Sequence, residues 1–347
     1  MLEPALLVYY THDAPGVGSA RLRERFRVRV NERGGTPSHE QIVAAAADAH
    51  ALCFFVPDLI DRALIASLPE LRVLAGYGKG FDNVDVAAAT ERGIWVTNVP
   101  DALTEATADL AWALMLGIAR NVARGDAAVR ARDFDGWQPD RLLGANVSGK
   151  RLGLLGFGAI GRAMARRAVG FAMEVVYFDI EPAAPDVESE FHVRYAPFDE
   201  VLRDADYVVV LMPLTDSTRG ALGAAELARM RPSAFLINPS RGSIVDERAV
   251  AAALAAQRIA GYASDVFAFE DRQYADRPTY VDAALLADFD RTLFTPHLGT
   301  AVLEARLGLA QSQARSVEDA LSGRRPYGAV NDVCGGGHRA AGPRVVR

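Results

Sequence analysis

Three charged side chains in the last third of the chain have the types and the order that an acid–base site for a small anion needs. Arg241, Glu270 and His297 each lie just beyond a short apolar run that is typical of a β-strand. A guanidinium binds an oxyanion through two parallel hydrogen bonds. A carboxylate beside an imidazole orients the ring and favours its protonated form. Each side chain alone is more often structural, but their joint placement after successive strands predicts a site that binds an anion and transfers a proton.

A glycine-rich turn upstream predicts that a dinucleotide binds near this site. Gly156, Gly158 and Gly161 follow the apolar run 152–155 and open a helical pattern. In such a turn the first glycine allows the sharp bend, the second lets the backbone approach a pyrophosphate, and the third lets the helix pack on the strand. Asp179 lies about 20 residues further on, at the end of the next strand, where an acid can bind the ribose hydroxyls. Its charge would repel a 2′-phosphate, so we expect NAD rather than NADP.

Composition excludes several other classes of protein. A chain of 347 residues is too long for one simple core, so two domains are expected. The net charge of −6 argues against a nucleic-acid binder. Cys53 and Cys334 have no metal-ligand or disulfide spacing, so we predict no metal site and a reducing compartment. The N-terminus lacks a basic leader, and the most apolar stretch, 106–119, is too short to cross a bilayer. We therefore expect a cytoplasmic protein without a membrane partner.

Two successive series of alternating strands and helices predict the α/β class. The expected strands are 6–10, 51–56, 71–75 and 94–97 in the first series, and 152–155, 174–178, 207–212, 234–238, 261–266 and 292–294 in the second. The expected helices are 38–50, 84–92, 104–122, 159–169, 247–257 and 302–321, with Ser38 and Asp246 as caps. This pattern favours parallel sheets with helices on both faces.

Taken together, these residues make the chain similar to the D-2-hydroxyacid dehydrogenase family, which uses an Arg, a Glu and a His in this order. The resemblance runs from about residue 6 to residue 332, and the strings 93–101 and 238–247 are specific to that family. It implies two doubly wound, Rossmann-like domains of the α/β class, with parallel sheets and the active site in the cleft between the domains. It also implies a homodimer formed partly by the helix that begins at Thr104. The implied domains are 1–101 plus 298–333 for the substrate and 102–297 for NAD. We expect the Gly- and Arg-rich tail 334–347 to be disordered.

The resemblance also implies which residues hold the coenzyme. Asp265 would bind the nicotinamide carboxamide, and Thr107 would lie near the nicotinamide. The full predicted set is Thr107, Gly156, Phe157, Gly158, Ala159, Ile160, Gly161, Asp179, Pro213, Thr218, Asn238, Pro239, Asp265 and Gly299.

Within that family the chain looks most like the phosphite (phosphonate) dehydrogenases. The strings that carry this similarity are 79–83, 136–139 and 275–278, together with Arg306. They imply that the substrate is bound by Lys79, Gly80, Trp137 and Arg306, in a pocket positive enough for a doubly charged oxyanion. Two positions depart from the pattern of those enzymes, since Val56 stands where they have Met and Leu142 where they have Tyr.

These observations leave three functions open. We predict first an NAD-dependent dehydrogenase for phosphite or a small phosphonate. The alternative is a 2-hydroxyacid dehydrogenase that reduces glyoxylate or hydroxypyruvate, which Val56 and Leu142 favour. A dinucleotide-sensing protein similar to the family's corepressors is disfavoured, because a sensor needs no acid–base pair. A formate dehydrogenase is disfavoured because it would carry Gln in place of Glu270.

Overall fold

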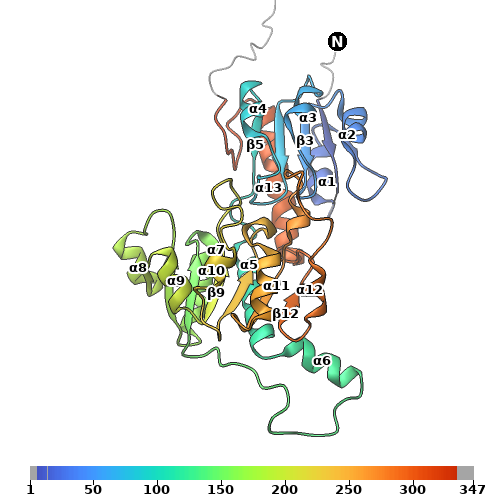
Figure 1. Ribbon diagram of the computed structural model, residues 1–347. Helices are drawn as coiled ribbons and strands as arrows, with labels where there is room; N and C mark the ends of the chain where they lie inside the picture. The colour runs from blue at the N-terminus through green and yellow to red at the C-terminus, as the bar shows by residue number, and fades with distance from the viewer. Residues whose placement is uncertain (1–5, 14, 334–347) are drawn as a thin grey trace, which may run out of the picture. The chain divides into compact units, whose positions relative to one another are not determined.

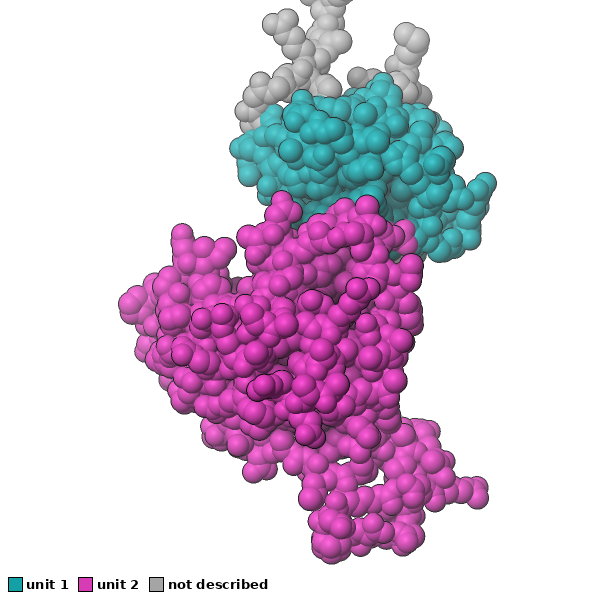
Figure 2. All heavy atoms as spheres, in the orientation of Figure 1, with its two compact units in different colours: residues 1–103, 302–347 teal, residues 104–301 magenta. Residues whose placement is uncertain are grey.

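A computed structural model describes residues 6–13 and 15–333 and shows two compact units (Figures 1 and 2). Unit 1 contains residues 1–103 and 302–347, and unit 2 contains residues 104–301. The predicted boundaries were 101/102 and 297/298. Residues 298 and 299 stay with unit 2 because the amides of Leu298 and Gly299 donate to the Asp265 carboxylate, over 2.7 and 2.8 Å.

Over the described residues of unit 1 the sheet has five strands in the order β2-β1-β3-β4-β5, and each pairing between them is parallel. The strands are β1 (Leu7–Tyr10), β2 (Arg27–Val30), β3 (Ala51–Phe54), β4 (Val73–Gly76) and β5 (Trp95–Thr97). Every residue of β1, β3 and β4 is buried, as expected for parallel strands covered on both faces. The edge strand β2 was not predicted, because its Arg-Val-Arg-Val sequence has only two apolar residues.

The helices of unit 1 come from both ends of the chain. They are α1 (Val17–Arg23), α2 (His39–Ala46), α3 (Arg62–Ala66), α4 (Val86–Glu91) and α13 (Leu303–Leu321). Ser38 caps α2 as predicted, in a reciprocal capping box with Gln41. Helix α13 packs against α1 and β4, and the amide of Gln313 donates to the carbonyl of Ala75 over 2.8 Å.

The sheet of unit 2 has seven parallel strands in the order β12-β11-β10-β9-β6-β7-β8. They are β6 (Arg151–Leu155), β7 (Glu174–Phe178), β8 (Val193–Tyr195), β9 (Tyr207–Val210), β10 (Phe235–Asn238), β11 (Gly261–Ser264) and β12 (Thr292–Phe294). The chain first adds β7 and β8 on one side of β6 and then crosses to add β9 and the later strands on the other side. The winding of the sheet therefore reverses between β6 and β9. Ligands of such sheets bind outside the carboxyl ends of the strands at this reversal. The predicted α/β class with two Rossmann-like parallel-sheet domains is confirmed.

Unit 2 has eight α-helices in the part of the chain that the structure describes. They are α5 (Thr104–Ala119), α6 (Val122–Arg130), α7 (Ala159–Val169), α8 (Pro185–Phe191), α9 (Phe198–Asp204), α10 (Ala224–Leu227), α11 (Glu247–Ala255) and α12 (Ala283–Ala287). Two 3₁₀ turns, η1 (Gly242–Ile244) and η2 (Ala268–Glu270), follow β10 and β11. Among the described residues, no helix has both the length and the apolar composition needed to cross a bilayer.

Helix α5 is shorter than predicted. It ends at Ala119 rather than at residue 122, because Asn121 has a left-handed backbone (φ 55°) and α6 then starts in a new direction. Its apolar side chains, among them Trp112 and Met115, are buried in the core of unit 2. Several exposed apolar side chains, among them Val122, Val129 and Phe134, lie in α6 and the segment after it, which extends away from the rest of unit 2 in Figure 1.

Candidate active site

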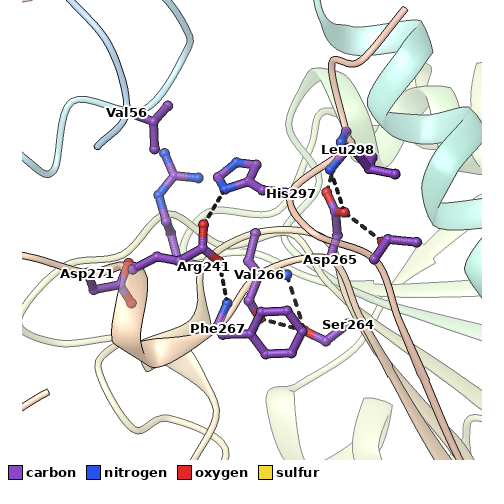
Figure 3. A network of polar contacts seen from close by, with 12 residues as sticks. Val56, Arg241, Ser264, Asp265, Val266, Phe267, Asp271, His297 and Leu298 are labelled. Carbon is purple, nitrogen blue, oxygen red and sulfur yellow. Dashed lines mark hydrogen bonds and ion pairs between the residues drawn. The ribbon is translucent and has the colours of Figure 1, made fainter. Parts of the chain in front are cut away.

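The imidazole of His297 and the carboxylate of Glu270 form a close pair in unit 2 (Figure 3). His297 Nδ1 lies 2.7 Å from Glu270 Oε2. The backbone amide of Phe267 donates to the other oxygen, Glu270 Oε1, over 2.8 Å, so the carboxylate is held at both ends. Because an ionised carboxylate only accepts hydrogen bonds, Nδ1 carries the proton of this bond. Nε2 is therefore the nitrogen left to exchange a proton with a bound molecule.

The turn that carries His297 is fixed by Asp265, at the end of β11. His297 has a left-handed backbone (φ 54°), which is uncommon outside glycine. Its amide donates to the carbonyl of Asp265 over 2.8 Å. The Asp265 carboxylate accepts from the Thr295 hydroxyl over 2.6 Å and from the amides of Leu298 and Gly299. Burial raises the pKa of Asp265 above its usual range, and these hydrogen bonds oppose that shift.

Arg241 lies in the neighbouring loop, directly before η1. Its Nη1 donates to the carbonyl of Ser240 over 2.8 Å. The loop is held by buried Asn238, whose amide group donates to the carbonyl of Arg241 over 2.9 Å and accepts from the Ser240 amide over 3.1 Å. Figure 3 shows the side chains of Arg241 and His297 directed toward the same side of this network. A permanent cation and an acid–base pair thus come from adjacent strand ends.

The glycine-rich turn after β6 fits a dinucleotide. Gly156 has φ 109°, and a Cβ there would lie 2.9 Å from the backbone of Leu211, so only glycine suits the position. Nothing lies within 4 Å of where a Cβ of Gly158 would stand, which leaves open space beside the turn. Helix α7 begins there without a side-chain cap, so its first amides remain available to an anion. Asp179 accepts from the Phe157 amide over 2.7 Å, which places the acid beside the turn.

The other residues predicted to hold the coenzyme lie along the carboxyl ends of the same strands. Gly161 is buried in α7, and Ala159 and Ile160 form its first turn. Pro213 follows β9, and its carbonyl accepts from the Thr218 hydroxyl over 2.6 Å. The hydroxyl of Thr107 donates to the carbonyl of Gly299 over 3.3 Å. Asn238 is the last residue of β10 and Pro239 follows it, and both are buried. The side chain of Phe157 stacks on Tyr177 inside the core, so only its backbone faces the turn.

Three of the predicted substrate residues belong to unit 1. Lys79 and Gly80 lie in the loop after β4, and the carbonyl of Lys79 accepts from the Asn98 side chain over 2.8 Å. Arg306 is in the first turn of α13. Its carbonyl accepts from the Tyr77 hydroxyl over 2.7 Å, and its guanidinium lies 5.9 Å from the centre of the Tyr77 ring. Tyr77 therefore connects the lysine loop to α13.

Trp137, the fourth predicted substrate residue, belongs to unit 2. It lies in the extended segment after α6 and is 84% exposed. Within unit 2, Arg241, Glu270 and His297 lie in the segments that follow β10, β11 and β12, at the strand ends that also carry predicted coenzyme residues. The role of Trp137 in binding the substrate stays a prediction.

Several polar residues that support the site were not predicted. Thr295 donates to Asp265, and the buried Ser264 hydroxyl donates to the carbonyl of Val266 over 2.7 Å. Glu247 and Asp271 accept amide hydrogen bonds in the loops that carry Arg241 and Glu270. Thr295 and Ser264 lie close to predicted residues in the sequence, which was the one visible signal, whereas the bonds of Glu247 and Asp271 join distant parts of the sequence. Among the described residues, no group of three or more His, Cys, Asp or Glu side chains could hold a metal ion.

Comparison with known proteins identifies the family. Residues 112–299 match the model for the D-isomer specific 2-hydroxyacid dehydrogenase NAD binding domain. The chain is 38% identical to a glyoxylate reductase of Pyrococcus furiosus over 328 residues, which cover 93% of this chain and 95% of the relative. This chain belongs to the D-isomer specific 2-hydroxyacid dehydrogenase family.

Solved structures agree with the assignment of this chain to the family. A glyoxylate reductase from Paecilomyes thermophila has a TM-score of 0.83 and 29% identity, covering 94% of this chain and 98% of that chain. An NADPH-dependent glyoxylate/hydroxypyruvate reductase from Sinorhizobium meliloti, in complex with NADP and malonate, has a TM-score of 0.82 and 29% identity, covering 94% and 97%. The predicted nicotinamide dinucleotide coenzyme is confirmed, since the matched domain is NAD-binding and contains the glycine-rich turn, Asp179 and His297.

Proposed function

We propose that this dehydrogenase reduces a small 2-oxo acid, with glyoxylate or hydroxypyruvate as the preferred substrate, and that it uses NADH. The observation that carries the proposal is the 2.7 Å contact between His297 and Glu270, beside Arg241, in a chain whose named relatives include glyoxylate reductases. These relatives favour a 2-oxo acid over phosphite.

In this proposal each side chain has one task. Arg241 binds the carboxylate of the substrate, because its planar guanidinium pairs with both oxygens. His297, protonated on both nitrogens, donates the Nε2 proton to the carbonyl oxygen, which becomes the hydroxyl of the product. Glu270 stabilises the imidazolium through Nδ1 and fixes the plane of the ring. NADH, when bound, supplies the hydride to the carbonyl carbon, so the two electrons and the proton balance.

A substrate panel tests this function. Purified protein is mixed with NADH and glyoxylate, hydroxypyruvate or phosphonopyruvate, and in the reverse direction with NAD and phosphite or hydroxymethylphosphonate, while NADH absorbance is followed. We expect rapid oxidation of NADH with the first two. Phosphite is the second candidate, supported by Lys79 and the string 136–139. Turnover of phosphite without turnover of any 2-oxo acid would reverse the order of the two.

We further propose that Lys79, Gly80 and Arg306 of unit 1 contact the substrate. Lys79 and Arg306 would add positive charge around its carboxylate. Replacing Lys79 by Ala should mainly raise KM, since a contact with the ground-state anion is lost, whereas His297→Ala should abolish turnover and leave coenzyme binding intact. An unchanged KM in Lys79→Ala would remove that residue from the site.

A preference for NAD over NADP is also part of the proposal. It rests on Asp179, whose Oδ2 accepts from the Phe157 amide and whose Oδ1 accepts from the Ile180 amide over 2.7 Å. Both bonds fix the carboxylate where the ribose of a dinucleotide would lie, and a 2′-phosphate there would meet a negative charge. The relevant measurement is the ratio of kcat/KM for NADH and NADPH.

We propose a homodimer in which the segment after α5 covers the partner. The segment exposes apolar side chains on and after α6: Val122, Val129, Phe134, Trp137 and Leu143 are 59, 60, 56, 84 and 73% exposed. Several exposed apolar side chains on one segment favour a role in an interface. Sedimentation of the wild type should give a dimer, and the triple variant Phe134→Ser, Trp137→Ser, Leu143→Ser should give a monomer. A location in the cytoplasm stays a prediction.

A further inference from the structure

The loops that carry Arg241 and Glu270 exchange hydrogen bonds in both directions. Asp271, which follows Glu270, accepts from the amide of Ser243 in the first loop; the Oδ2 to N distance is 2.8 Å. Glu247, which follows the first loop, accepts from the amide of Ala268 in the second; the Oε1 to N distance is also 2.8 Å. Each loop thus supplies one carboxylate and one amide, and we call this arrangement the two-loop clasp.

The backbones of the two loops are in direct contact at Gly242. A Cβ placed there would overlap with the carbonyl carbon of Phe267 and the nitrogen of Ala268. Any side chain at this position would therefore push the loops apart. Because glycine has no side chain, the two loops lie close enough for the amides of Ser243 and Ala268 to bond the carboxylates of Asp271 and Glu247.

Both carboxylates of the clasp are buried. Glu247 is 7% exposed and Asp271 is 4% exposed. Burial raises the pKa of Glu247, and the amides of Ala268 and Asp282 oppose that shift. Moving a carboxylate from water into the protein interior costs free energy unless the carboxylate accepts hydrogen bonds there. Such groups hold their partners strongly, because a broken bond leaves two buried polar atoms unsatisfied.

We propose that Glu247 and Asp271 are positioning residues that set the place of the Glu270–His297 pair relative to Arg241. Ala268, held by Glu247, follows Phe267, whose amide fixes Glu270 Oε1 over 2.8 Å. Ser243, held by Asp271, is two residues from Arg241. A displacement of about 1 Å between an anion clamp and a proton donor can lower a rate up to about 100-fold. The clasp therefore serves the reaction without touching the substrate.

This inference deepens the proposed function and rests on it for its kinetic readout, so the experiment includes a readout that needs no substrate. Asp271→Ala and Glu247→Ala are compared with Asp271→Asn and Glu247→Gln, which keep an acceptor oxygen. Asp206→Ala is the matched control, because Asp206 also accepts a backbone amide, that of Arg151 over 2.9 Å, but precedes β9 at the opposite end of the sheet. Amide hydrogen exchange of the segments 241–246 and 266–272 is measured without ligand, and kcat and KM with a 2-oxo acid and NADH.

We expect each alanine variant to lower kcat by about 10- to 100-fold while the KM for NADH changes little. Exchange of both segments should accelerate at least about tenfold in either variant, because one broken bond frees the opposite loop. The Asn and Gln variants should recover most of kcat. Alanine variants that keep the exchange rates and the kcat of Asp206→Ala would overturn the proposal.

Two further outcomes are decided by the same design. If the alanine variants do not fold, Asp271→Glu replaces them, since it keeps the buried charge and moves the acceptor by one methylene. A lower kcat and faster exchange then support the clasp, and unchanged values refute it. If the wild type reduces no 2-oxo acid, the proposed function fails, and hydrogen exchange alone still decides whether the clasp joins the two loops.

Discussion

Replacement of Glu270 by Gln tests the acid–base pair most directly. The change keeps the size of the side chain and removes its charge. The bond to His297 is short, at 2.7 Å, and the two side chains are 24 and 30% exposed. A hydrogen bond between charged partners contributes about 1.5–3 kcal/mol, and this degree of exposure favours the lower half of that range. A loss of about 1.5–2 kcal/mol corresponds to a decrease in kcat/KM of about 10- to 30-fold.

The assay is the reduction of glyoxylate or hydroxypyruvate, followed by NADH absorbance between about pH 6 and pH 8. The loss should be found throughout this range, because the neutral amide of Gln cannot replace the charge-assisted bond of the carboxylate to Nδ1 of His297. Glu174→Gln is the control, since Glu174 pairs with Arg151 over 2.8 Å at the first residue of β7, away from the strand ends that carry the site. A decrease below about threefold at every pH would refute the role of Glu270.

Three other replacements have defined outcomes. Asp179→Ser should raise the KM for NADH about tenfold and that for NADPH less, because the lost carboxylate binds ribose hydroxyls and repels a phosphate. Gly156→Ala should lower the free energy of unfolding in urea by about 1–3 kcal/mol, owing to φ 109° and the contact with Leu211. Glu247→Gln should change how stability depends on pH. The folded-state pKa of Glu247 is raised, so its contribution is full below the ordinary glutamate pKa of about 4.3 and is lost as the pH rises through the higher folded value. The stability of the Gln variant relative to wild type should therefore increase from acid toward neutral pH, as measured by urea unfolding.

Controls make each of these outcomes decisive. Equal increases in the two KM values for Asp179→Ser would contradict its role in coenzyme choice. Gly170→Ala is the control for Gly156→Ala, because Gly170 has φ −65° and a Cβ there would make only an ordinary contact with Arg167 at 3.5 Å. It should unfold at the same urea concentration as wild type or a slightly higher one. A stability difference between Glu247→Gln and wild type that is the same at acid and neutral pH would show that the glutamate titrates normally.

Local patterns were sufficient to predict the parallel α/β architecture and the pairing of Glu270 with His297. Glu270 and His297 each follow an apolar run, and adjacent parallel strands place such residues at one edge of a sheet, so their contact follows from the alternation of elements. The cap of α2 at Ser38 was predictable because its partners lie within three residues. The end of α5 was not, because apolar residues continue past Asn121, and only its left-handed backbone interrupts the helix.

The clasp and the exposed segment lay beyond such patterns. Asp271 and Ser243 are 28 residues apart. Because almost any residue can donate a backbone amide, the residue type at position 243 does not reveal that Asp271 accepts from it. Trp137 was predicted from a string rather than from periodicity, and its 84% exposure follows from the extended path of the chain after α6. Long-range contacts to the backbone are therefore the part of such a site that a structure adds.

The division of unit 1 between the two ends of the chain sets an order for synthesis on the ribosome. All seven strands of unit 2 have been synthesised once residue 301 has left the exit tunnel. In unit 1, β3 and β4 must wait for α13 and the 2.8 Å bond from Gln313 to Ala75. At this stage the nascent chain carries a complete NAD-binding domain, while the sheet of unit 1, which precedes it in the chain, still lacks the cover of α13. Truncation before residue 302 would leave that sheet exposed to chaperones and proteases, while the domain that binds NAD could still form.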